Sequence, residues 1–304
     1  MKKYLIILVL ILILMAGALA LGIYLPKNNL SEKETVFIVK KGENLFQIAE
    51  NLEKEALIKS KFIFDFYVLI KGTQGKLQAG EYSLTSSISI AKIAEKITSG
   101  DVTKMTVTIP EGFTVKQIEE RLGLKLPGEN LEGFLFPDTY QFSPRVKDEE
   151  VIEKMKENFN KKLTTDLKEE IERQEKTILE IVTMASLIEK EVKTKEDREL
   201  VSGILWKRLG NGIPLQVDAT INYITGKQTT EVSKEDTQID SPYNTYKYRG
   251  LPSGPICNPG IESILAAIYP EDSSYWYYLS TSEGKTIFSK TLEEHNIAKA
   301  KYLK

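Results

Sequence analysis

The sequence predicts a protein of mixed helices and short strands that follows one N-terminal membrane-spanning helix. After two lysines, residues 4–25 carry no charged side chain, a length that can cross a bilayer as a helix. Farther on, residues 37–52 and 107–122 each show the pattern of a strand, a glycine turn and an amphipathic helix. Beyond residue 147 the sequence shows helix patterns, then one long loop, and then the pattern of a β-hairpin.

The apolar segment predicts a retained membrane anchor. Lys2 and Lys3 precede it and Pro26 ends it, so the positive-inside rule places Lys2 in the cytoplasm and the remaining chain outside. The alternative is a signal peptide cleaved after Ala20, because Ala18 and Ala20 form a small-x-small pattern. Apolar residues continue to Leu25, which favours the anchor.

Composition excludes several classes of protein. Cys257 is the only cysteine, so intramolecular disulfides are excluded, and His295 is the only histidine, which argues against a histidine-rich metal site. The formal net charge is -2, with no basic cluster, which argues against a nucleic-acid partner. We therefore expect no metal and no cofactor. Roughly 279 residues follow the anchor, enough for two domains.

The expected order is an anchor at 1–25, a polar linker at 26–35, a first domain at 36–105 and a second at 106–304. In the first domain, strands at 36–39 and 77–84 enclose helices that begin near Asn44 and at Ser60, and a helix at 88–97 follows. The segments 37–52 and 107–122 align without gaps and share Gly42 with Gly112 and Gln47 with Gln117. Duplication and chance recurrence of a common unit both explain this similarity.

The second domain is expected to be rich in helices. Residues 148–175 are charged and helical, with apolar side chains spaced along one face. A Pro- and Gly-rich loop covers 241–260, and a hairpin at 275–289 precedes a final helix from Leu292.

Residues 178–192 form the most informative helix, because a carboxylate lies within its apolar arc. At 100° per residue, Glu189 is next to Ile178 and Val182, whereas Glu191 is at the edge of the arc. A glutamate held against apolar side chains resists ionisation, which suits a general acid. The alternative is a boundary residue paired with Lys193.

Acids, amides and aromatic side chains gather in three other segments, at 131–140, 215–220 and 241–260. Aromatic faces pack on sugar rings while amides and carboxylates bind hydroxyls, so this composition fits a glycan cleft. A structural loop with a buried aromatic core is the alternative for each segment taken singly.

Two resemblances extend this interpretation. Residues 39–49 resemble the start of a LysM module, a small glycan-binding unit. The segments 131–140, 185–191, 215–218, 243–246 and 250–252, with His295 and Asn296, resemble the endolytic murein transglycosylases of the YceG-like group, in order along the chain. The resemblance implies a LysM-like domain at 36–105 and an α+β catalytic domain at 106–304. It also implies cleavage of peptidoglycan glycan strands with a 1,6-anhydro-N-acetylmuramoyl product, and Glu189 as the catalytic residue.

In this chemistry Glu189 donates a proton to the glycosidic oxygen and then accepts one from the muramoyl 6-hydroxyl, so no second catalytic carboxylate is required. The candidates for binding the sugar are Glu132, Asp138, Gln216, Asp218, Tyr243 and Asn244. Two alternatives stay open: a muramidase in which Asp138, Glu132 or Asp218 assists a water, and a non-catalytic glycan-binding scaffold for wall-synthesis proteins. The linker, with a reach of at most roughly 35 Å, would keep the protein near the membrane, where nascent strands emerge.

Overall fold

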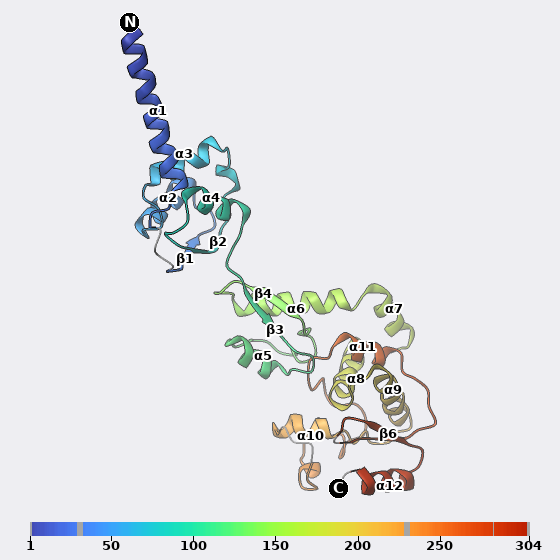
Figure 1. Cartoon of the computed structure of the whole chain (residues 1–304). Helices are drawn as coiled ribbons and strands as arrows, with labels where there is room; N and C mark the ends of the chain where they lie inside the picture. Colours follow the sequence, from blue (N-terminus) through green and yellow to red (C-terminus); the bar gives the residue numbers. More distant parts are fainter. Residues whose placement is uncertain (1, 29–32, 228–231, 282, 303–304) are drawn as a thin grey trace. The chain divides into compact units, whose positions relative to one another are not determined.

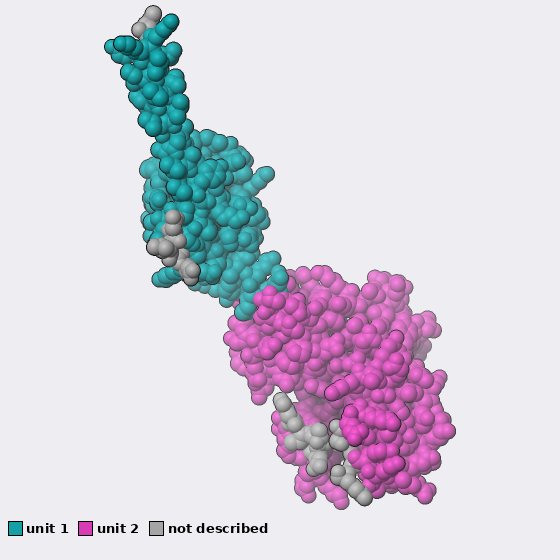
Figure 2. All heavy atoms as spheres, viewed as in Figure 1, with its two compact units in different colours: residues 1–105, 141–145 teal, residues 106–140, 146–304 magenta. Residues whose placement is uncertain are grey.

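The computed structural model describes residues 2–28, 33–227, 232–281 and 283–302 and contains two compact units (Figure 1, Figure 2). Unit 1 comprises residues 1–105 and 141–145, and unit 2 comprises residues 106–140 and 146–304. Each unit has its own hydrophobic core. Residues 29–32 of the expected linker lie outside the described residues.

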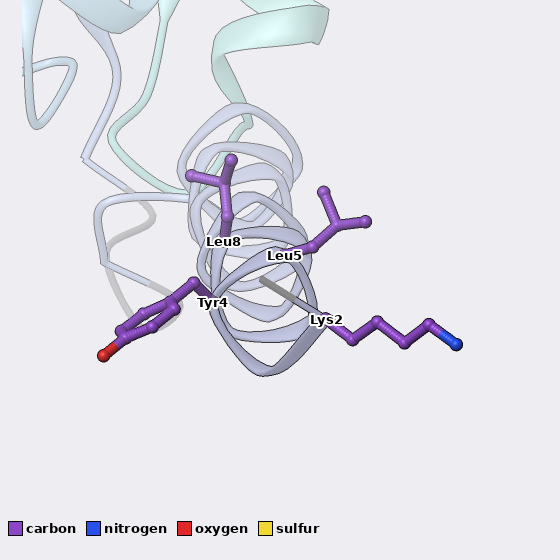
Figure 3. Close-up of a pocket in the computed structure, with 4 residues that line it drawn as sticks. All are labelled: Lys2, Tyr4, Leu5 and Leu8. Atoms are coloured by element: carbon purple, nitrogen blue, oxygen red, sulfur yellow. The ribbon is translucent and has the colours of Figure 1, made fainter.

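Helix α1 (Lys2–Tyr24) is the one helix in the described part of the chain that is long and apolar enough to cross a membrane, a property that N-terminal signal sequences share. Most of its side chains are exposed. Figure 3 shows Lys2, Tyr4, Leu5 and Leu8 projecting outward from its first turns, around a shallow surface depression that contains no acidic side chain. Near its other end Ile23 is buried within unit 1.

Unit 1 is built around one antiparallel strand pair. Strand β1 (Thr35–Val39) pairs with β2 (Gly80–Leu84), with Thr35 opposite Leu84 and Val39 opposite Gly80. Helices α2 (Leu45–Lys54) and α3 (Lys61–Ile70) and the short η1 (Gln74–Lys76) lie between the strands in sequence, and α4 (Ile90–Ser99) follows. The core combines apolar side chains from these strands and helices, including Phe37, Ile48, Leu52, Phe64, Tyr82 and Ile93.

Both copies of the strand-turn-helix unit use the same local hydrogen bonds. At the start of α2, Gln47 N–H donates to Asn44 Oδ1 (3.0 Å), and Asn44 N–H donates to Gln47 Oε1 (3.0 Å). Thr114 and Gln117 form the same capping box at the start of α5 (Val115–Leu122). Gly42 and Gly112 adopt positive φ angles of 88° and 75° in the preceding turns. Two of the residues shared by the copies, the glycine and the glutamine, are therefore those that the turn and the helix cap require.

Unit 2 is mainly helical. Its helices are α5, α6 (Asp148–Lys162), α7 (Thr165–Arg173), α8 (Ile178–Glu191), α9 (Lys195–Gly210), α10 (Asp218–Thr225), η2 (Asp236–Gln238), α11 (Ile261–Ile268) and α12 (Leu292–Tyr302). Strands β5 (Tyr277–Ser280) and β6 (Thr286–Ser289) form an antiparallel hairpin. Strands β3 (Met105–Thr108) and β4 (Thr139–Phe142) form a further pair. The expectation of a mixed helix-and-strand protein behind one N-terminal apolar helix is confirmed.

Helix α8 lies in the centre of unit 2, with α11 and α9 beside it (Figure 1). Residues 181–188 are all buried, including Thr183 and Ser186. The apolar arc indicated one buried face, and neighbouring elements in fact bury the whole circumference of this segment. The Ser186 hydroxyl donates to Thr183 O (2.7 Å) and accepts from Ile256 N–H (3.0 Å), so this buried hydroxyl has both kinds of partner.

Candidate active site

Glu189 lies in the last turn of α8, where this helix leaves the core. The helix starts at Thr177, whose hydroxyl accepts from Glu180 N–H (3.1 Å) while the Glu180 carboxylate accepts from Thr177 N–H (2.8 Å). This capping box fixes the first turn, and the buried residues 181–188 fix the helix axis. Only 7% of the Glu189 side chain is exposed, so its carboxylate is held at a nearly enclosed site.

Three donors surround the Glu189 carboxylate. The Ser263 hydroxyl donates to Oε2 (2.7 Å), Gly260 N–H donates to the same oxygen (3.1 Å), and Arg198 Nη2 is 3.4 Å from Oε1. Gly260 is the N-cap of α11 and Ser263 lies in its first turn, so the positive end of that helix faces the acid. These donors and the guanidinium stabilise a negative charge on Glu189.

A second acid, Glu111, belongs to the same site. Its Oε1 is 2.0 Å from the point where a Cβ on Gly260 would lie, so residue 260 has space only for glycine beside this carboxyl. Burial and the negative charge of Glu189 raise the pKa of Glu111, while Arg198 opposes this shift. The turn that carries Glu111 contacts α8 directly, because a Cβ on Gly112 would be 3.5 Å from Glu189 Cγ.

Glu132 is connected to this turn through buried Asn258. Asn258 Nδ2 donates to Glu132 Oε1 (3.1 Å), and Asn258 O accepts from Gly112 N–H (2.9 Å). Glu132 also accepts from Val115 N–H at the start of α5 (3.1 Å). Burial raises the pKa of Glu132 to about 7, against the opposing effects of Val115 N–H, the Tyr223 hydroxyl and Lys190. Glu132 therefore holds the loop around residue 112 in position.

Two half-buried tyrosines adjoin Glu132. The Tyr223 and Tyr243 rings have centroids 5.1 Å apart, and the Tyr223 hydroxyl hydrogen-bonds Glu132. Burial, followed by the negative charge of Glu132, raises the pKa of the Tyr223 hydroxyl. The pair thus provides a tyrosine hydroxyl bonded to an acid, together with aromatic faces that suit a sugar ring.

Glu191 belongs to a separate cluster on the other side of α8's end. Its carboxyl hydrogen-bonds the Tyr278 hydroxyl and Ala219 N–H, and burial, reinforced by the charge of Asp218, raises its pKa to about 7. The exposed Asp218 accepts a hydrogen bond from the Tyr246 hydroxyl. These contacts join α8 to the start of α10 and to β5.

Gln216 lies beside that cluster in a strained backbone conformation. Its φ is 56°, in the left-handed region that is costly for a residue with a side chain. Buried Arg208 holds it there by donating through Nη2 to Gln216 Oε1 (2.8 Å) and to Pro214 O (2.6 Å). The Gln216 residue is nonetheless exposed.

Asn244 and Asp138 are placed apart from Glu189. Buried Asn244 donates through Nδ2 to Thr237 O (3.0 Å) and Ile239 O (2.8 Å) and accepts from two backbone N–H groups, so it organises its own loop. Asp138 accepts from Asn158 Nδ2 (3.0 Å), and this bond lowers the pKa of Asp138. Among the predicted residues, Glu132 and Tyr243 thus share the loop network near Glu189, and Gln216 and Asp218 adjoin Glu191.

Sequence reasoning missed four residues of the site: Glu111, Arg198, Asn258 and Ser263. Glu111 had a weak signal, because it precedes the shared glycine of the second strand-turn-helix copy. Asn258 and Ser263 reach Glu132 and Glu189 from segments distant in sequence, whereas Arg198 comes from the next helix, and no spacing pattern marks the three.

Fold and site define a two-unit protein with an apolar N-terminal helix and a glutamate-centred site of the kind used in acid–base chemistry. The YceG-like family model matches residues 37–301. The chain belongs to the YceG-like family.

Named relatives and a solved structure agree with this membership. A Bacillus subtilis (strain 168) protein named endolytic murein transglycosylase is 36% identical over 89% of this chain and 86% of its own length. A Streptococcus pneumoniae (strain D39) protein of the same name is 30% identical over 90% of this chain and 59% of its own length. The crystal structure of a YceG-like protein from Listeria monocytogenes is 31% identical, with a TM-score of 0.59 over 88% of this chain and 100% of that chain.

Proposed function

We propose that this protein is an endolytic murein transglycosylase that cleaves the glycan strands of peptidoglycan and leaves a 1,6-anhydro-N-acetylmuramoyl end. The observation that carries the proposal is the enclosed Glu189 carboxylate with its three donors, in a chain that is 36% identical to a protein of this name. The reaction is a lyase reaction on a polysaccharide and requires no cofactor.

Glu189 acts first as an acid and then as a base. The protonated carboxyl donates to the glycosidic oxygen as the bond to the muramoyl anomeric carbon breaks. The resulting carboxylate is stabilised by Ser263, by Gly260 N–H and by Arg198, which supports proton donation. It then accepts the proton of the muramoyl 6-hydroxyl as that oxygen bonds to the anomeric carbon, so the attacking group comes from the substrate.

Glu111 is proposed as the positioning acid of the pair. Its carboxyl lies against Gly260, and its raised pKa reflects burial and the adjacent charge of Glu189. Burial and the adjacent charge of Glu189 disfavour ionisation of Glu111, so Glu111 retains its proton more readily than an isolated carboxyl does. This arrangement complements the donors around Glu189, which favour its charged form.

For the sugar, we propose contacts from both sides of the end of α8. Tyr243, with Tyr223, offers an aromatic face, and Glu132 fixes the loop beside it. Gln216 and Asp218 offer exposed polar groups near Glu191. Asn244 and Asp138 are proposed to act through the loops that they organise.

The test is Glu189→Gln, which preserves the shape of the side chain and removes the proton donor. Activity on isolated peptidoglycan should fall by roughly 10²- to 10⁴-fold. Glu191→Gln is the matched control on the same helix, because Glu191 bonds Tyr278 and Ala219 instead of the Ser263 group. Loss in Glu191→Gln with activity retained in Glu189→Gln would transfer the role to Glu191.

A hydrolytic muramidase is the second candidate, because Glu111 places another carboxyl at the site. Mass spectrometry separates the two reactions, since hydrolysis adds a water to the product and ring closure does not. Products with reducing ends alone would establish hydrolysis. Binding of glycan strands without any cleavage would instead support a scaffold that recruits wall-synthesis proteins.

Location and the first domain complete the proposal. We propose that α1 is retained as a single-pass anchor with Lys2 in the cytoplasm, because its last turn is part of unit 1 through buried Ile23. The enzyme would then meet nascent strands at the membrane and limit their elongation.

We also propose that residues 36–105 form a LysM-like glycan-binding domain, supported by residues 39–49 and the β1–β2 pair that brackets α2 and α3.

A further inference from the structure

Helix α3 has an apolar face that is exposed among the described residues of unit 1. Phe62, Phe66, Leu69 and Ile70 are 73%, 42%, 49% and 67% exposed. Their spacing of four, seven and eight residues places them in one arc of the helix at 100° per residue. The opposite face carries buried Phe64 and Val68. Contiguous exposed aromatic and aliphatic side chains of this kind mark a contact surface.

The exposed arc adjoins the membrane-exit end of α1. The Ile63 Cδ1 atom is 2.7 Å from the point where a Cβ on Gly22 would lie, so glycine allows the two helices to approach closely. The Tyr24 and Tyr67 rings pack edge to face with centroids 6.4 Å apart. Ile63 and Tyr67 occupy the side of α3 next to the arc, so the arc continues the surface of α1. Figure 1 shows α3 beside this end of α1, with the N-terminal part of α1 projecting beyond unit 1.

The length of α1 places α3 at the level of the lipid headgroups. A helix of 23 residues rises about 34 Å, slightly more than the roughly 30 Å of hydrocarbon in a bilayer. If α1 spans that layer, Gly22 and Tyr24 lie at its outer boundary, and α3 lies there too. Tyrosines are favoured at this depth.

Cationic side chains stand at both ends of α3. Lys61 Nζ is 5.7 Å from the centre of the Phe62 ring, and Lys71 Nζ is 5.9 Å from that of Tyr67. Lysines that extend along aromatic rings reach lipid phosphates while their neighbours enter the apolar layer. Helix α3 carries one acidic side chain, Asp65, while Lys61 and Lys71 at its ends supply the cationic groups that an anionic bilayer surface attracts.

We propose that α3 is a second membrane contact, in which the arc of Phe62, Phe66, Leu69 and Ile70 lies in the outer interface of the lipid bilayer. Lys61 and Lys71 contact anionic headgroups. The inference rests on the proposal that α1 is a retained anchor. Unit 1 is then held against the membrane along one face and is not a domain on a loose tether.

The test uses the full-length chain in vesicles of phosphatidylcholine and phosphatidylglycerol. A single cysteine replaces Phe66 or Ile70 and carries an environment-sensitive fluorophore. Cys257 is buried, and the unsubstituted chain measures any labelling there. Val36→Cys is the matched control, because Val36 is 46% exposed on β1, which Figure 1 shows at the end of unit 1 away from the projecting part of α1.

Lipids with a quencher on the upper acyl chain should remove most of the emission at positions 66 and 70 and little at position 36. Lowering the anionic lipid fraction should reduce the difference. Equal, weak quenching at all three positions overturns the proposal and indicates that the arc contacts a protein partner and not the bilayer.

A label in the middle of α1, at Leu12→Cys, separates this inference from the anchor on which it depends. Quenching at position 12 without quenching at positions 66 and 70 refutes the α3 contact alone. Absence of quenching at position 12 refutes the retained anchor, and the α3 contact with it.

Discussion

Ser263→Ala tests directly whether the donors around Glu189 contribute to catalysis. The Ser263 hydroxyl is 2.7 Å from Glu189 Oε2, and the side chain of Glu189 is almost fully enclosed. Removing a hydrogen bond to a charged group at such a site costs about 1.5–3 kcal/mol. In the proposed mechanism the carboxylate forms when the proton is donated, so this cost would raise the barrier and lower kcat by roughly 10- to 100-fold.

The assay is release of soluble fragments from isolated peptidoglycan by the full-length protein in detergent. KM should stay close to its original value, because Ser263 contacts the acid and not the sugar in this scheme. Ser202→Ala is the matched control: Ser202 is buried on α9, and its hydroxyl has no hydrogen-bond partner among the described residues. Equal activity of the two variants would refute the reasoning, as would a further loss when Ser263→Ala is added to Glu189→Gln.

Three further substitutions have defined outcomes. Gly203→Ala should lower the free energy of unfolding, measured in urea, by about 3 kcal/mol, because its Cβ would lie 1.9 Å from a backbone carbonyl oxygen. Gly210→Ala is the control on the same helix: its Cβ would meet nothing within 4 Å, so this substitution should be neutral or stabilising. Equal unfolding midpoints would contradict this. Glu191→Gln should gain stability relative to the wild type between pH 5 and pH 8. The folded-state pKa of Glu191 is raised to about 7 from 4.5, so its contribution is fully present below pH 4.5 and is lost as pH rises through 7, a change of at most about 3 kcal/mol. A pH-independent difference in melting temperature would show that the carboxyl titrates alike in both states. Gly260→Ala should displace the Glu111 carboxyl and lower activity. The loss of stability should be small, because the Glu111 side chain is flexible. Full activity of this variant would show that Glu111 has no role in the site.

Local structure was predictable where a few neighbouring residues determine it. Asn44 was expected to cap a helix and does so in a capping box. The helix expected at 88–97 is present as Ile90–Ser99, and it ends at Gly100, because glycine adopts the left-handed conformation at φ 69° that terminates a helix. In these cases the hydrogen-bonding groups lie within four residues of one another, so a single sequence contains the whole interaction.

The environment of α8 was not predictable in the same way. Its apolar arc predicted one buried face, yet the polar positions Thr183 and Ser186 are buried as well, and Ser186 contacts Ile256 and Cys257, some seventy residues later in the chain. Glu189 was identified as unusual because a charge interrupted a regular pattern. Ser263 and Arg198 interrupt no pattern, and they become part of the site only when the chain folds.

The two strand-turn-helix copies show where local prediction ends and tertiary context begins. Gly42 and Gly112 form the same turn, and Gln47 and Gln117 close the same cap. The residue before the glycine differs: Lys41 is exposed on the surface of unit 1, whereas Glu111 lies against Gly260 beside Glu189. An acid at this position gains a role because α11 presents a glycine that leaves room for its carboxyl. The shared glycine and glutamine therefore determine the local turn and helix cap, whereas the environment of Glu111 depends on the helix that packs against it.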